Sequence, residues 1–393
     1  MNSSAQHRPR PPRRRTTAVA VALALASSAL TGALTSPAAA TPATHTRPDV
    51  LQQRLDELVG SAGVPGALAA ERDRYGHTRT YTAGVGDLAT GSKMPDDGQV
   101  RIGSNTKAFT AVVVLQLVGE HRLALDDTIG EHLHSLAFSD GTDAGAVTVG
   151  QLLQQTSGLP NYSKYLGDDV RTYQPLELVD LALQHKEDFR PGKWGYSNTN
   201  YVLAGLIVEE VTGRSIAAEI DQRVIKRLGL RHTYFPAPGD ATIRGPHPHG
   251  YIQESPAAPL TPGAPLTDVT GTDPSWAWAA GQLVSTNSDL NTFYTALLKG
   301  GLLKKAQLDA MRTTVPTTGG TFPAGTRYGL GLVSTPLSCG GVHWGHGGSF
   351  PGYETRGGVT EDGRAVDIAV TVQPNDGAAM QKVEAAVDAA LCR

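Results

Sequence analysis

Ser104 and Lys107 stand three positions apart in the segment RIGSNTKAF, residues 101–109, directly before an apolar run. Residues at this spacing share one face of a helix, so the amine would lie one turn from the hydroxyl. A lysine can take the proton of a serine when burial or a cationic neighbour lowers its pKa towards neutrality. The pair therefore indicates a nucleophile with its base. The alternative is a serine that caps a helix and a lysine exposed in its first turn.

A second group of polar residues, Tyr196-Ser197-Asn198, lies just before a helical pattern. A tyrosine two positions from an asparagine can direct both polar groups into one cleft. The phenol would then transfer a proton, and the amide would bind a substrate carbonyl. The alternative is that Ser197 or Asn198 is simply the N-cap of that helix.

A histidine followed by two glycines gives the third group. His346 lies in the strand-like segment WGHGGSFPGY, where glycines allow a ligand to approach the backbone closely. The alternative is a tight turn with an exposed histidine. Four other histidines are close in sequence but show no metal-ligand spacing, so we expect loop or surface positions for them and no metal. They are His132, His134, His247 and His249.

The elements that must position these residues follow from the apolar patterns. Both ends of the chain contain strand-like segments and a helix, whereas the middle is mainly helical. We therefore expect an α/β fold, an antiparallel sheet flanked by helices, with an inserted all-helical region. The expected domain covers 48–393, with the α/β part at about 48–115 and 255–393 and the helical region at about 116–254.

Individual elements can be predicted within this plan. Helices are expected at 49–59, 108–120, 148–159, 176–186, 199–213, 288–301 and 378–391. A hairpin is expected from 66–73 and 77–87, and short strands are expected within 327–333, 341–348, 355–362 and 365–373. The segment 245–274 is rich in proline and glycine and reads as a long connection.

Residues 1–40 have the order of a secretory signal peptide. Five arginines precede an apolar stretch, and the small-residue cleavage site Ala38-Ala39-Ala40 follows. Removing this segment changes the formal charge from −3 to −8, because it holds five basic and no acidic residues. An acidic protein without basic runs argues against nucleic acid and against electrostatic membrane binding. No later stretch is apolar enough to anchor the chain, so we expect a secreted, extracellular monomer.

The chain has two cysteines, Cys339 and Cys392. In an oxidising compartment they are expected to form one disulfide, which would join the last helix to a segment about fifty residues upstream. Two free thiols are the alternative. A zinc site is disfavoured, because there is no second cysteine pair.

The order Ser-x-x-Lys, Tyr-x-Asn, His-x-Gly resembles the penicillin-recognising serine hydrolases, the superfamily of penicillin-binding proteins and serine β-lactamases. The chain is most similar to the secreted D-alanyl-D-alanine carboxypeptidases, in which a histidine stands in the third motif. Segments such as YSNTNYVLAG and SWAWAAGQLVSTNSDLNTF match, and so do the positions of the two cysteines. The resemblance covers nearly all of the expected domain.

The resemblance implies roles for seven residues. Ser104 would be the acylated nucleophile, with Lys107 and Tyr196 sharing proton transfer. The backbone N–H groups of Ser104 and Ser349 would form the oxyanion hole. The remaining residues would contact the substrate: Asn198 its acyl-side amide, His346 as a cation or donor, and Trp276 as a wall of the cleft. No cofactor is implied.

Three positions depart from the pattern of those carboxypeptidases. Gly347 replaces a usual threonine, and Gln155 stands where many relatives have a histidine. Val333 lies near the position of an arginine that would hold the terminal carboxylate of the peptide. Arg327 and Arg356 are possible substitutes for it, and otherwise carboxylate recognition would fall to His346.

The sequence therefore predicts a secreted serine D-alanyl-D-alanine carboxypeptidase that acts on peptidoglycan stem peptides and binds β-lactams. The alternative with the same chemistry is an esterase, a D-amino-acid amidase or peptidase, or a class C-like β-lactamase. The alternative from another class is an inactive cell-wall-binding or regulatory protein of the same fold. The intact Ser104, Lys107 and Tyr196 argue against that last reading.

Overall fold

The computed structural model describes residues 49–134, 136, 144–167, 171–186, 191–254, 259–319, 322–374 and 377–393. Its centre is one antiparallel sheet in the order β3-β2-β1-β14-β13-β11-β10-β9-β8, with β12 paired to β13. The expected hairpin is β1, Gly66–Arg72, and β2, Thr78–Asp87, and Ala69 pairs with Tyr81. The other strands of this sheet are β3 Ser92–Lys93, β8 Val315–Pro316, β9 Arg327–Tyr328, β10 Val333–Pro336, β11 Val342–Gly345, β12 Gly348–Phe350, β13 Tyr353–Thr360 and β14 Ala365–Val370.

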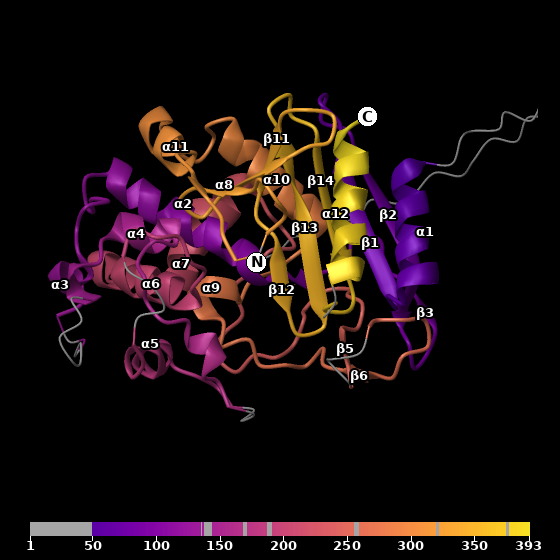
Figure 1. The fold of residues 1–393 in the computed structure, drawn as a ribbon, viewed down its shortest axis with the longest axis horizontal. Coiled ribbons are helices and arrows are strands. Elements are labelled where there is room, and N and C mark those ends of the chain that lie inside the picture. The colour runs from indigo at the N-terminus through magenta and orange to yellow at the C-terminus, as the bar shows by residue number, and fades with distance from the viewer. Residues whose placement is uncertain are drawn as a thin grey trace, which may run out of the picture. The chain divides into compact units, whose positions relative to one another are not determined.

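Each face of the sheet is covered by helices. The helices α1, Val50–Ala62, and α12, Gly377–Leu391, lie side by side on one face, where their leucines, alanines and valines meet apolar residues of β1 and β14. The other face packs on α10, Asn287–Leu298, with α2, Thr106–Gly119, beyond it. Figure 1 shows α1 in indigo beside α12 in yellow, so both ends of the described fold meet on one face of the sheet.

The middle of the chain is helical, as the sequence predicts. Between Ile129 and Leu228 the described residues form helices and no strand. These helices are α3 Ile129–His132, α4 Val149–Gln154, α5 Pro175–Leu183, α6 Asn198–Thr212, α7 Ile216–Ile220 and α8 Lys226–Leu228. The short helices α9, Trp278–Gly281, and α11, Lys305–Met311, follow later in the chain.

Helix α2 is buried on all sides, which explains its sequence. Its apolar residues do not form a single stripe. Every residue of the helix except Gln116 and Val118 is buried. It packs against α6 and α9, and it begins directly after the short 3₁₀ turn Gly103–Asn105. The expected C-cap of α6, Gly213, adopts the left-handed conformation with φ 66°.

The long connection differs from its expected form. It contains two short paired strands, β5, Tyr251–Gln253, and β6, Leu266–Asp268. Three-residue strands surrounded by proline and glycine carry too short an alternation to be recognised from sequence.

The predicted signal peptide, residues 1–40, lies outside the described residues.

The expected disulfide is present between Cys339 and Cys392, and it links the turn before β11 to the end of α12. Over the described ranges, no helix combines the length and the apolarity needed to cross a bilayer.

Candidate active site

The turn that carries Ser104 is fixed from two sides. Gly103 has φ +47°, and a Cβ there would lie 2.5 Å from the carbonyl oxygen of Ser349. Only glycine therefore lets the turn approach β12 this closely. Asn105 ties the turn to the sheet, because its Nδ2 donates to Thr355 Oγ1 at 2.8 Å and its Oδ1 accepts from Tyr294 at 2.7 Å. Ser104 thus lies in a 3₁₀ turn against β12 and is not the N-cap of α2.

Lys107 is fully buried, which rules out the exposed first-turn lysine. Its Nζ lies 3.0 Å from Ser104 Oγ, 2.7 Å from Asn198 Oδ1 and 2.8 Å from the carbonyl oxygen of Ala280. Burial lowers the pKa of this amine well below its usual value. A neutral amine has two N–H donors and one lone pair. In the neutral form, with Asn198 and Ala280 accepting these two N–H groups, the lone pair would face Ser104 Oγ.

Tyr196, in the segment just before α6, contacts the same serine. Its hydroxyl donates to Ser104 Oγ at 2.8 Å, and burial raises its pKa above the usual value, so the phenol keeps its proton at neutral pH. The sequence motif therefore places Tyr196 and Asn198 at one point, on either side of the Ser104–Lys107 pair. The resulting order of groups is phenol, hydroxyl and amine.

Gln155 holds the start of α6, a role that the sequence did not reveal. It ends α4 in the left-handed conformation with φ 62°. Its Oε1 accepts from the Ser197 backbone N–H at 3.0 Å and from Asn200 Nδ2 at 2.6 Å. The position where many relatives have histidine thus fixes the backbone that carries Tyr196. The only sequence signal was its departure from the family pattern.

Strand β12 forms the other wall of the site. A Cβ at Gly348 would lie 1.9 Å from the carbonyl oxygen of Ile102, so glycine is required for this contact. The contact holds the backbone of Ser349 beside Gly103 and the nucleophile turn. The two backbone N–H groups expected to form the oxyanion hole, those of Ser104 and Ser349, thus belong to segments in direct contact.

A depression opens beside Ser104. Its lining has no ionisable side chain apart from the phenol of Tyr162, and it consists of Ser104, Tyr162, Asn198, Trp276, Ala277, Ala280, Gly281 and Ser349. Trp276 stacks on Phe350 with ring centroids 5.3 Å apart, and its carbonyl oxygen accepts from the Tyr162 hydroxyl at 2.6 Å. The expected substrate residues Asn198, Trp276 and Ser349 therefore border one space with the nucleophile.

His346 differs from the expected cation. It is 2 % exposed and packs edge-on against Tyr328, beside Tyr196. Burial, with the nearby charge of Arg356, lowers its pKa to about 3. Nδ1 lies 2.5 Å from the carbonyl oxygen of Gly347 and must donate to it, so the neutral ring accepts from Tyr328 through Nε2 at 3.1 Å. Sequence alone could not show this enclosure.

The two arginines considered for a terminal carboxylate are already engaged. Arg356 pairs with Glu354 and with Glu384, the latter at 2.8 Å. Arg327 donates to the side chain and the carbonyl oxygen of Thr314, at 2.9 and 2.8 Å. Val333 is buried against Trp194 and Tyr328. Arg356 is therefore neutralised by two carboxylates and Val333 carries no charge, whereas Arg327 is held by hydrogen bonds to Thr314 at the exposed surface.

The pH dependence of activity follows from these groups. Because His346 is neutral above about pH 4, kcat/KM should show no loss near pH 6.5, the usual pKa of histidine. Lys107 must lose its proton to act as a base, so activity should rise with pH through its lowered pKa. Profiles between about pH 4 and 9 should have the same shape for a substrate with a terminal carboxylate and for a neutral ester. A fall through pH 6–7 for the carboxylate substrate alone, absent in His346→Gln, would show a cationic histidine instead.

Comparison with known proteins agrees with the family resemblance of the sequence motifs. Residues 51–391 match the family model described as Beta-lactamase. The chain is 33% identical over 187 residues to Penicillin-binding protein 4 of Amycolatopsis lactamdurans, a match that covers 46% of this chain and 48% of that protein. It is 32% identical over 198 residues to Protein flp of Staphylococcus aureus strain MW2, covering 47% and 38% of the two. The chain therefore matches less than half the length of either relative.

Two solved structures resemble the whole described fold. A D-stereospecific amidohydrolase from a Streptomyces species is 38% identical, with a TM-score of 0.75 over 86% of this chain and 98% of that one. The D-amino acid amidase of Ochrobactrum anthropi SV3, complexed with L-phenylalanine amide, is 27% identical, with a TM-score of 0.76 over 87% and 96%.

Proposed function

Since the chain belongs to the Beta-lactamase family of penicillin-recognising serine hydrolases, we propose that it hydrolyses amide bonds of D-amino-acid derivatives through an acyl-enzyme on Ser104. The observation that carries the chemistry is the row formed by Tyr196 OH, Ser104 Oγ and Lys107 Nζ, with separations of 2.8 and 3.0 Å. A nucleophile within hydrogen-bond reach of a desolvated base is the arrangement that acyl transfer needs.

The proposed acylation step gives each of these groups a defined role. Lys107 accepts the Ser104 proton as Oγ attacks the carbonyl carbon, and the oxyanion is held by the N–H groups of Ser104 and Ser349. The C–N bond then breaks, and Tyr196 gives its proton to the departing amine. Lys107 returns the proton to the phenolate. Water enters the ester by the reverse route and regenerates Ser104.

The substrate class rests on charge as well as on similarity. A free carboxylate in this cleft would lose its hydration without gaining a cation, because Arg356 is paired twice and His346 is neutral. This supports an amide or ester leaving group without a terminal charge. The D preference is proposed from the Streptomyces and Ochrobactrum enzymes, whose names state it.

The D-alanyl-D-alanine carboxypeptidase predicted from the sequence is the second candidate. The observation that favours it is the bond from Cys339 to Cys392, since the resemblance to those carboxypeptidases includes both cysteine positions. The same bond supports the proposal that the protein is exported to an oxidising compartment. In that case the substrate would be a peptidoglycan stem peptide.

A set of matched substrates separates the two candidates. The first pair is a D-Ala-D-Ala peptide and the same peptide with a C-terminal amide, which differ only in charge. The second pair is D- and L-phenylalanine amide, which differ only in configuration. We expect the C-terminal amide to be cleaved about tenfold faster than the free acid, because an unpaired carboxylate costs at least 1 to 2 kcal/mol to bury. We also expect D-phenylalanine amide to be preferred over the L form. A preference for the free acid in kcat/KM would support the carboxypeptidase instead.

A further inference from the structure

A cavity of about 580 Å³ lies at the far end of the helix that carries Lys107. Its lining is mixed, with apolar residues such as Leu115 and Leu302 and charged or polar residues such as Gln116, Arg223, Arg227 and Lys304. Helix α2 rises about 1.5 Å per residue, so Gly119 in the cavity lies roughly 18 Å from Lys107. The cavity is therefore separate from the candidate active site. Its volume is in the range of pockets that hold small molecules.

One wall of the cavity is an unusual backbone segment. Asp221–Ile225 forms a π-helical turn between α7 and α8, and Gln222 and Arg223 in this turn line the cavity. Such turns are rare inside helices and occur frequently at functional sites. On the opposite wall, Gln307 has a buried Oε1 that accepts no hydrogen bond from the described residues.

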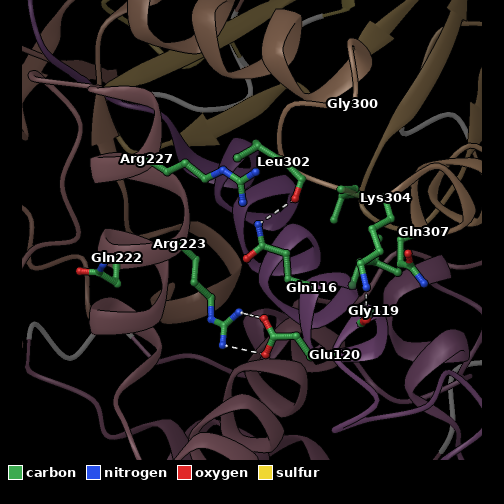
Figure 2. Close-up of a pocket in the computed structure, with 12 residues that line it drawn as sticks. Gln116, Gly119, Glu120, Gln222, Arg223, Arg227, Gly300, Leu302, Lys304 and Gln307 are labelled. Atoms are coloured by element: carbon green, nitrogen blue, oxygen red, sulfur yellow. Dashed lines mark hydrogen bonds and ion pairs between the residues drawn. The ribbon is translucent and has the colours of Figure 1, made fainter.

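The charges around the cavity do not balance. Arg223 pairs with Glu120 and with Glu219, and Figure 2 shows both of its bonds to Glu120. Glu120 also pairs with Arg122, and Glu219 also pairs with Arg214. Three arginines thus share two carboxylates.

Two further cations line the cavity. Lys304 donates to the carbonyl oxygen of Gly119 at 2.8 Å, at the C-terminal end of α2. Arg227 forms no ion pair with the described residues, and Figure 2 shows its guanidinium extending towards Gln116 and Leu302. The cavity therefore has a net positive charge with Arg227 as its free cation.

We propose that this cavity binds a small organic carboxylate with an apolar body. The planar guanidinium of Arg227 matches a carboxylate in a two-bond contact. The buried leucines Leu115, Leu302 and Leu303 would contact the apolar body. This composition favours an organic acid over inorganic phosphate, which has no apolar part. The ligand would contact the C-terminal turn of the helix whose first turn carries Lys107.

Three probes test the proposal on the full-length protein: hexanoate, hexanamide as its uncharged equivalent, and inorganic phosphate. Calorimetric titration should show saturable binding of hexanoate, with a Kd at least about tenfold below that of hexanamide or phosphate. Arg227→Gln should raise the Kd for hexanoate about tenfold, because a charge-assisted hydrogen bond is lost.

Two control variants locate the bound probe. Arg231→Gln removes an exposed arginine just beyond α8 that does not line the cavity, and it should leave the Kd unchanged. Ser104→Ala should also leave it unchanged, which would separate this cavity from the proposed active site. Hydrolytic activity of Arg227→Gln should equal that of the wild type and show that the variant is folded. Equal binding of hexanoate by Arg227→Gln, tighter binding of phosphate, or no saturable binding would each overturn the proposal.

Discussion

Replacing Lys107 with methionine is expected to lower kcat/KM for amide hydrolysis by about a thousandfold or more, because the base that accepts the Ser104 proton is removed. The side chain is fully buried and its amine is desolvated. Methionine has a similar length and suits an apolar environment, so the fold should survive. Steady-state kinetics together with the thermal midpoint of unfolding would separate loss of chemistry from loss of structure.

Lys305→Met is the matched control for this experiment. Lys305 is exposed and pairs with Asp309 on the surface at 2.6 Å. An exposed ion pair contributes little to the free energy of unfolding, so this variant should keep both activity and stability. Hydrolysis by a folded Lys107→Met at close to the wild-type rate would show that another group is the base. The role of the whole row of groups would then have to be reassigned.

Gly348→Ala is expected to lower kcat by about a hundredfold to a thousandfold, the loss typical of a missing oxyanion donor. The added Cβ would lie 1.9 Å from the carbonyl oxygen of Ile102, which is backbone and cannot rotate away. Strand β12 must therefore move from the nucleophile turn and carry the N–H of Ser349 with it. The loss should appear in kcat more than in KM, because the oxyanion forms only in the transition state.

Gly271→Ala gives the corresponding control. Gly271 lies in the loop before Trp276, and an added Cβ meets nothing within 4 Å. This variant should retain wild-type kcat. If Gly348→Ala also retained it, the N–H of Ser349 would not be part of the oxyanion hole.

The sequence predicted much of this site because its motifs lie at element ends. An α2 that is apolar on all sides implied a buried lysine. Tyr196 lies just before α6 and Asn198 is its first residue, so the two can face the same point. The hairpin of β1 and β2 and the two terminal helices followed from their periodicity.

Properties that depend on distant parts of the chain could not be predicted. The neutral state of His346 results from its burial beside Tyr328 and Tyr196, which only the folded chain brings against its ring. The engagement of Arg356 depends on Glu384, which comes from α12. The neutral His346 and the paired Arg356 shift the proposed substrate away from a free carboxylate. Both result from tertiary packing and carry no local pattern.

The most direct test of the central claim is to find where an acylating substrate forms its covalent bond. The purified protein would be incubated with an activated D-amino-acid ester or with penicillin, quenched, weighed as an intact protein and mapped by peptide mass. The proposed mechanism predicts one acyl group per chain, carried by Ser104, and no labelling of Ser104→Ala. Labelling of a different residue, or equal labelling of Ser104→Ala, would contradict it.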